Sequence, residues 1–213
     1  MPVHVKICGL TTPETLDAAL KNGASHVGFV FFAKSPRHLT PEKAAALAAR
    51  VQGRAKVVGL FVNPLVDDID RVRAQVSLDI IQLHGDEAPA VVSRIRAGSG
   101  LDVWKAFPVR TSRDFNDSLK YSGAASLILY DAKPPVGSDL PGGNGVRFDW
   151  ELLRDHRHSV PWALSGGLDT GNIAEAVRVT GASLLDVSSG VETSPGVKDV
   201  DKIAAFLQAA NLL

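Results

Sequence analysis

The only cysteine of this chain, Cys8, stands where α/β proteins often carry a catalytic group. It ends the first short apolar segment, residues 3–8, and Gly9 follows it directly. Strand ends of this kind are common sites of chemistry, and a thiol there can act as an acid, a base or a nucleophile. A lone cysteine is also often just a small buried hydrophobic residue. The choice between the two interpretations depends on the rest of the chain.

Ionisable side chains also occur in the other apolar segments, at alternate positions. Strand side chains alternate between two faces, and we assign Lys6 and Cys8 to the face that points into a barrel. The same alternation assigns to the inside the residues Gln82, His84, Lys105, Phe107, Leu129, Asp131, Asp186 and Ser188, and to the outside their apolar neighbours, including Trp104 and Ala106. Buried charges are costly unless they are paired or functional. Lys6, Asp131 and Asp186 on one rim therefore favour a site over three isolated core ions, and Lys6 can pair with Asp186 if the first and last strands are neighbours.

Two turns near the end of the chain predict a phosphate site. Gly166 and Gly167 follow the seventh apolar segment, and Ser188, Ser189 and Gly190 follow the eighth. In barrels these two loops often bind phosphate at a helix N-terminus. Small residues let backbone N–H groups approach the phosphate oxygens, and serine hydroxyls add donors. Two tight turns without a ligand are the alternative, and the combination of both turns favours a phosphorylated small molecule.

The elements that must position these residues alternate regularly. The short apolar segments, which we predict as strands, are residues 3–8, 26–32, 56–62, 80–84, 102–109, 126–131, 161–165 and 184–188. The helical patterns between and after them are residues 13–22, 41–50, 65–75, 88–97, 112–120, 172–179 and 200–210, with 150–154 a weaker candidate for the sixth helix. Three dipeptides resemble an N-cap followed by proline, namely Thr12-Pro13, Thr40-Pro41 and Asn63-Pro64.

This alternation predicts parallel strands with right-handed crossovers. Eight such units in 213 residues indicate one compact (β/α)8 barrel spanning residues 1–213. An open doubly wound sheet is the alternative, but no G-x-G-x-x-G follows the first segment. Residues 133–147, rich in glycine and proline, predict a functional loop after the sixth strand.

Composition narrows the classes of function. The 23 basic and 23 acidic residues cancel, which argues against a nucleic-acid partner. No apolar segment is long enough to span a membrane, and the first residues show no signal-peptide pattern. One cysteine excludes an internal disulfide, and the histidines show no metal-ligand spacing. We therefore expect a cytoplasmic protein without a metal.

Several motifs together resemble the phosphoribosylanthranilate isomerase family of tryptophan biosynthesis. The matching stretches run from end to end and are residues 6–10 (KICGL), 35–37 (SPR), 82–85 (QLHG), Asp131, 165–168 (SGGL) and 186–192 (DVSSGVE). The resemblance implies a (β/α)8 barrel that acts on N-(5-phosphoribosyl)anthranilate and forms the 1-deoxyribulose 5-phosphate product. It implies an Amadori rearrangement, which is an internal redox reaction that needs no cofactor.

The resemblance also implies roles for individual residues. Asp131 would be the general acid that opens the furanose ring, and Cys8 the general base that removes the proton from C2′. A thiol must become a thiolate to act as a base, so we expect a cationic environment to lower the pKa of Cys8. Arg37 would bind the anthranilate carboxylate, for which a guanidinium offers a bidentate contact.

The other residues are assigned with less detail. Gly166, Gly167, Ser188, Ser189 and Gly190 would hold the phosphate. His84 and Asp186 would line the ribose or the wall of the site, and residues 133–147 would close over the substrate.

Two rival interpretations remain open. A related aminoaldose isomerase of histidine biosynthesis would be expected to carry aspartates at both acid–base positions, and Cys8 argues against it. The other rival is a phosphosugar-binding barrel without activity, in which Cys8 and Asp131 are only structural.

Overall fold

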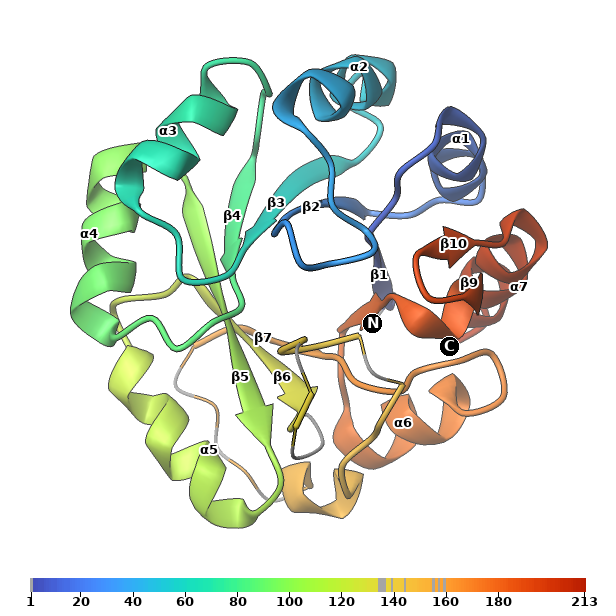
Figure 1. Ribbon diagram of the computed structural model, residues 1–213. Coiled ribbons are helices and arrows are strands. Elements are labelled where there is room, and N and C mark those ends of the chain that lie inside the picture. The colour runs from blue at the N-terminus through green and yellow to red at the C-terminus, as the bar shows by residue number, and fades with distance from the viewer. Residues whose placement is uncertain are drawn as a thin grey trace.

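The chain folds as a closed barrel of parallel strands with helices around it (Figure 1). The computed structural model describes residues 2–133, 137–138, 140–143, 145–154, 156, 158 and 160–213. In this described part the barrel strands follow chain order: β1 (His4–Cys8), β2 (His26–Phe31), β3 (Lys56–Phe61), β4 (Ile80–Leu83), β5 (Asp102–Val109), β6 (Leu127–Ala132), β7 (Trp162–Leu164) and β8 (Leu184–Val187). The predicted (β/α)8 barrel is confirmed, and the open sheet is wrong because β1 pairs with β8.

Helices cover the outside of the barrel. They are α1 (Pro13–Lys21), α2 (Pro41–Val51), α3 (Val66–Arg73), α4 (Pro89–Ser99), α5 (Ser112–Ser118), α6 (Ile173–Thr180) and α7 (Val200–Ala210), with the 3-10 helices η1 (Leu119–Tyr121), η2 (Trp150–Leu153) and η3 (Ser189–Val191). The stretch predicted as a weak sixth helix, 150–154, is thus the short 3-10 helix η2. None of the described helices is long and apolar enough to cross a membrane.

Two of the three predicted helix starts are confirmed. The hydroxyls of Thr12 and Thr40 accept hydrogen bonds from backbone N–H groups in the first turns of α1 and α2. The third is wrong, because α3 begins at Val66. Asn63 adopts a positive φ of 47° and accepts a hydrogen bond from the backbone N–H of Asp86 at 2.8 Å, so it joins two loops instead of capping a helix.

Faces are predicted for β1, β4, β5, β6 and β8, and of these only β5 departs from the prediction. Trp104 and Ala106 belong to an apolar cluster inside the barrel, and the Trp104 ring lies 5.0 Å from that of His26. Lys105 points outward instead, and its Nζ contacts Glu87 Oε2 at 2.9 Å. The assignment of Lys105 and Phe107 to the inside, and of Trp104 and Ala106 to the outside, is therefore wrong. The pairing of Gln82 with Trp104 decides it, because paired residues of parallel strands face the same side.

The predicted pair of Lys6 and Asp186 closes the barrel. Lys6 of β1 pairs in register with Asp186 of β8, and Lys6 Nζ lies 2.8 Å from Asp186 Oδ1. Lys6 is fully buried and Asp186 is 5% exposed. Burial, the largest single effect, lowers the pKa of Lys6, but the charges of Asp186 and Cys8 and the hydrogen bonds to them together outweigh it, and the net pKa is raised. Lys6 therefore stays charged inside the barrel, below the thiol of Cys8.

The stability of this interior should depend on pH through His26. Burial, and then the charge of Lys6, lower the pKa of His26 from 6.5 to about 4. His4, Asp79 and Lys56 are the other charged or titratable groups acting on it. Because the unfolded chain binds this proton more readily, the free energy of unfolding should fall as pH drops from about 7 to 4, by at most about 2 kcal/mol at pH 5.

This is checked by denaturant unfolding between pH 4 and 8. The His26→Asn variant should show a flatter pH dependence than the wild type, and the exposed control His38→Asn should not. An unchanged slope in His26→Asn would contradict the prediction.

Candidate active site

A cavity of about 70 Å³ opens at the carboxyl ends of the strands. Its walls carry Cys8, Arg37, His84, Asp131, Gly166, Gly167, Asp186, Ser188 and Ser189, which are nine of the ten residues named from the sequence. Only Gly190 is not on the wall. A second cavity of about 280 Å³ adjoins it and shares His84 and Asp131. The closed barrel thus brings residues from both ends of the chain around one space.

Cys8 lies at the top of β1, 5% exposed, beside the Lys6–Asp186 pair. A Cβ placed on Gly28 of the neighbouring strand would lie 3.2 Å from the Cys8 Sγ and 3.1 Å from the Lys6 Cε, so both side chains face the same spot. Burial raises the pKa of Cys8, and the charge of Lys6 offsets only part of this effect. The expected lowering of this pKa is therefore wrong for the structure as it stands, since desolvation outweighs the nearby cation.

Asp131 is held from two sides at the top of β6. Its Oδ1 accepts a hydrogen bond from the backbone N–H of Ala132 at 2.8 Å, and its Oδ2 lies 3.1 Å from His84 Nε2. Gln82 Nε2 in turn lies 3.1 Å from His84 Nδ1. These contacts fix the orientation of the carboxyl group toward the cavity. Sequence reasoning gave Gln82 no role, although its place two residues before His84 on one strand face was the available signal.

The two loops predicted to bind phosphate lie side by side on the cavity wall. Gly166 has a φ of +91°, and a Cβ there would lie 2.7 Å from the backbone N of Ala132. Ser188 Oγ donates to the backbone carbonyl of Cys8 at 3.2 Å. Gly190 serves packing, because a Cβ at this position would lie 1.9 Å from the carbonyl oxygen of Leu168. Glycine is thus needed there to let one loop pass over the other.

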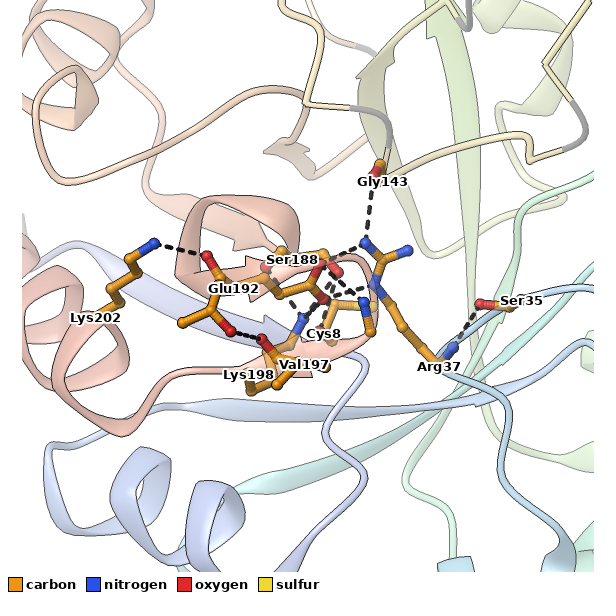
Figure 2. Close-up of polar contacts among 11 residues, drawn as sticks. Cys8, Ser35, Arg37, Gly143, Ser188, Glu192, Val197, Lys198 and Lys202 are labelled. Carbon is orange, nitrogen blue, oxygen red and sulfur yellow. Dashed lines mark hydrogen bonds and ion pairs between the residues drawn. The ribbon is translucent and has the colours of Figure 1, made fainter.

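Arg37 reaches the cavity from the loop between β2 and α2, but one edge of its guanidinium is already occupied. Its Nε and Nη2 donate to the two carboxylate oxygens of Glu192 at 2.7 and 2.8 Å (Figure 2). Lys198 forms an ion pair with the same carboxylate. Glu192 and Lys198 stand on β9 (Glu192–Ser194) and β10 (Val197–Lys198), an antiparallel pair that follows η3.

Sequence reasoning missed this hairpin and its ion pairs. Glu192 ends the motif at residues 186–192, which was a signal, whereas nothing in the sequence singles out Lys198. The described residues of the predicted loop that line the cavity are Leu140–Gly143, Gly145 and Val146. Residues 134–136, 139 and 144 of that loop lie outside the described residues.

A closed (β/α)8 barrel with a carboxyl group, a thiol and paired glycine–serine loops at its carboxyl end belongs to the class of barrels that act on small phosphorylated molecules. A family model described as N-(5'phosphoribosyl)anthranilate (PRA) isomerase matches residues 5–209, and the chain belongs to this family. It is 53% identical over 214 residues to the N-(5'-phosphoribosyl)anthranilate isomerase of Zymomonas mobilis subsp. pomaceae, covering 100% of both chains. It is 51% identical, again over 100% of both chains, to that of Rhodospirillum centenum.

Comparison with solved structures points to the same family. The crystal structure of phosphoribosyl anthranilate isomerase from Thermotoga maritima superposes with a TM-score of 0.89 at 37% identity, covering 99% of this chain and 100% of that one. Another structure of phosphoribosyl anthranilate isomerase, in complex with reduced 1-(o-carboxyphenylamino)-1-deoxyribulose 5-phosphate, superposes with a TM-score of 0.86 at 36% identity, covering 99% and 100%.

Proposed function

We propose that this protein converts N-(5'-phosphoribosyl)anthranilate to 1-(2-carboxyphenylamino)-1-deoxyribulose 5-phosphate in tryptophan biosynthesis. The observation that carries the proposal is that Cys8 and Asp131 line one cavity together with the loops at Gly166 and Ser188. The bound product analogue of the solved relative has the phosphate and the carboxylate that such a site requires. Membership of the isomerase family supports the same reaction.

In this proposal Asp131 and Cys8 divide the proton transfers. Asp131 protonates the furanose ring oxygen, the C1′–O bond breaks, and the anilino nitrogen lone pair forms an iminium ion. Cys8, as thiolate, removes the proton from C2′, and the electrons of that bond form an enolamine. Protonation at C1′ and loss of the 2′-hydroxyl proton give the ketone. C1′ is reduced and C2′ is oxidised, so the reaction balances without an added oxidant or reductant.

Two anchors would hold the substrate across this pair. The loops at Gly166, Gly167, Ser188 and Ser189 offer backbone N–H groups and hydroxyls to the phosphate. Arg37 offers its free N–H groups to the anthranilate carboxylate. Holding both ends places C2′ and the ring oxygen between the thiol and the carboxyl group, which is the positioning that the reaction requires.

The experiment that tests the function is a fluorescence assay for consumption of phosphoribosylanthranilate by the purified protein. We expect multiple turnovers without an added cofactor. The Cys8→Ala/Asp131→Asn double variant provides the background control. No turnover by the correctly folded wild-type protein would overturn the proposal.

Replacing the carboxylate anchor should weaken binding of the substrate selectively. Arg37→Ala removes a buried charge-assisted contact, and such contacts contribute about 1.5–3 kcal/mol, so KM should rise roughly 10- to 100-fold. Inorganic phosphate, measured as a competitive inhibitor, should bind nearly as well as before, because its loops do not include Arg37. Equal losses for both ligands would remove the proposed role.

A further inference from the structure

Glu192 lies at the centre of a buried ion cluster that reaches the wall of the cavity through Arg37. Its side chain is 3% exposed, and its two partners, Arg37 and Lys198, are 6% and 1% exposed. The three residues come from the β2–α2 loop and from the two strands of the β9–β10 hairpin (Figure 2). The cluster therefore joins a loop near the start of the chain to one near its end.

Each carboxylate oxygen of Glu192 accepts two hydrogen bonds. Oε1 accepts from Arg37 Nε at 2.7 Å and from Lys198 Nζ, and Oε2 accepts from Arg37 Nη2 at 2.8 Å and from the backbone N–H of Gly196 at 3.3 Å. The contact to Arg37 is a side-on bidentate pair, which fixes the plane of the guanidinium as well as its distance. Glu192 has no oxygen left for a ligand, so its role is toward Arg37.

The guanidinium is only partly available. Arg37 Nη2 donates to Gly143 O at 3.3 Å as well as to Glu192. No described residue hydrogen bonds to Nη1, although Gly143 lies beside it, where a Cβ would be 2.8 Å from this nitrogen. The stem of Arg37 passes directly over Gly9, where a Cβ would lie 2.6 Å from its Cδ. The stem of Arg37 is thus held against the residue that follows Cys8, and Nη1 is the nitrogen that a ligand can use.

The charges of the cluster leave one positive charge unbalanced. Arg37 and Lys198 contribute two cations and Glu192 one anion, whereas the neighbouring Lys6–Asp186 pair is neutral. Lys198 does not line the cavity, and its Nζ is held from behind the wall by the carbonyl oxygen and Oγ of Ser188, both at 3.1 Å. A single excess positive charge presented through Arg37 suits one carboxylate.

We propose that Glu192 is a positioning residue that holds Arg37 in place for the aromatic carboxylate of the substrate, with Lys198 balancing its charge. This inference rests on the proposed function, because the anthranilate carboxylate is the ligand in question. The physical reason is preorganisation: a free arginine side chain loses rotamer entropy when it binds, and Glu192 has already restricted it. Its removal should weaken binding while leaving the proton transfers at Cys8 and Asp131 in place.

The test compares Glu192→Gln with the wild type in steady-state kinetics. Glutamine keeps the shape but removes the charge and turns an N–H group toward Arg37. We expect KM for phosphoribosylanthranilate to rise at least about tenfold, with kcat and the inhibition constant of inorganic phosphate each changing less than about threefold. In an Arg37→Ala background the same substitution should raise KM less than about threefold further, because the arginine that Glu192 positions is absent.

Matched controls separate positioning from general damage. Glu87→Gln removes an equally buried glutamate that pairs with Lys105 on the outer side of the barrel, and it should leave KM within about twofold. If Glu192→Gln does not fold, the Glu192→Gln/Lys198→Met variant avoids an unpaired buried lysine and should show the same rise in KM. An unchanged KM, a parallel loss of phosphate binding, or full additivity with Arg37→Ala would overturn the inference. Activity of the wild type in the same assay shows that such a result concerns Glu192 and not the proposed function.

Discussion

Asp131→Asn is expected to lower kcat by a factor of about 10² to 10⁴, the usual contribution of a general acid. The asparagine side chain can still accept the hydrogen bond from Ala132 and still contact His84, so the geometry at the top of β6 should be kept. What it cannot do is deliver a proton to the furanose ring oxygen. The loss should therefore appear in kcat, with a smaller change in KM.

The measurement is steady-state kinetics, with circular dichroism and thermal unfolding to confirm the fold. Asp79→Asn is a matched control, because Asp79 also accepts a backbone hydrogen bond, from Val57 at 2.8 Å, but lies before β4 at the opposite end of the barrel. Normal turnover by Asp131→Asn would show that this carboxyl group is not the acid.

Cys8→Ala is expected to reduce kcat by a similar factor, at least about a hundredfold. The thiol is buried beside Lys6, and its removal leaves a small cavity but no unpaired charge, because Lys6 keeps its pairing with Asp186 at 2.8 Å. A loss of turnover with the fold kept would then reflect the missing base. Turnover at the wild-type rate in Cys8→Ala would instead leave the cysteine as a core residue.

The pH dependence gives a second measurement of the same residue. Because burial raises the pKa of Cys8, only a small fraction of the thiol is ionised near neutral pH. The ultraviolet absorbance of the thiolate, taken as the difference between the wild type and Cys8→Ala, should therefore increase with pH and still be rising at about pH 9. A thiolate signal already complete at about pH 7 would contradict the raised pKa of Cys8.

The barrel itself was predictable because its determinants are local. Apolar segments bounded by glycine, proline and polar residues occur at all eight strand positions, and β5 has the predicted bounds, Asp102–Val109. Thr12-Pro13 and Thr40-Pro41 mark helix starts because a cap and a fixed φ act within one turn. The β9–β10 hairpin was missed because two strands of three and two residues carry too short a pattern to recognise.

The facing of β5 shows where local pattern fails. Both faces of β5 contain apolar residues, so alternation alone does not tell which face is inside. The pattern predicts Lys105 on the inside, which is wrong. The register with β4 decides it, and Trp104 fills the barrel while Lys105 pairs with Glu87 outside. Asn63 is a similar case, since its partner Asp86 comes from another loop.

The sequence by itself determined the barrel, the set of residues at its carboxyl end and the family to which they belong, because strand alternation and short motifs are properties of neighbouring residues. Only the tertiary structure decided what surrounds each of those residues. The partner of Arg37 is Glu192, 155 positions away, and burial rather than the adjacent cation dominates the pKa of Cys8. Desolvation and ion pairing depend on which distant segments the closed barrel brings together, and no local pattern carries that information.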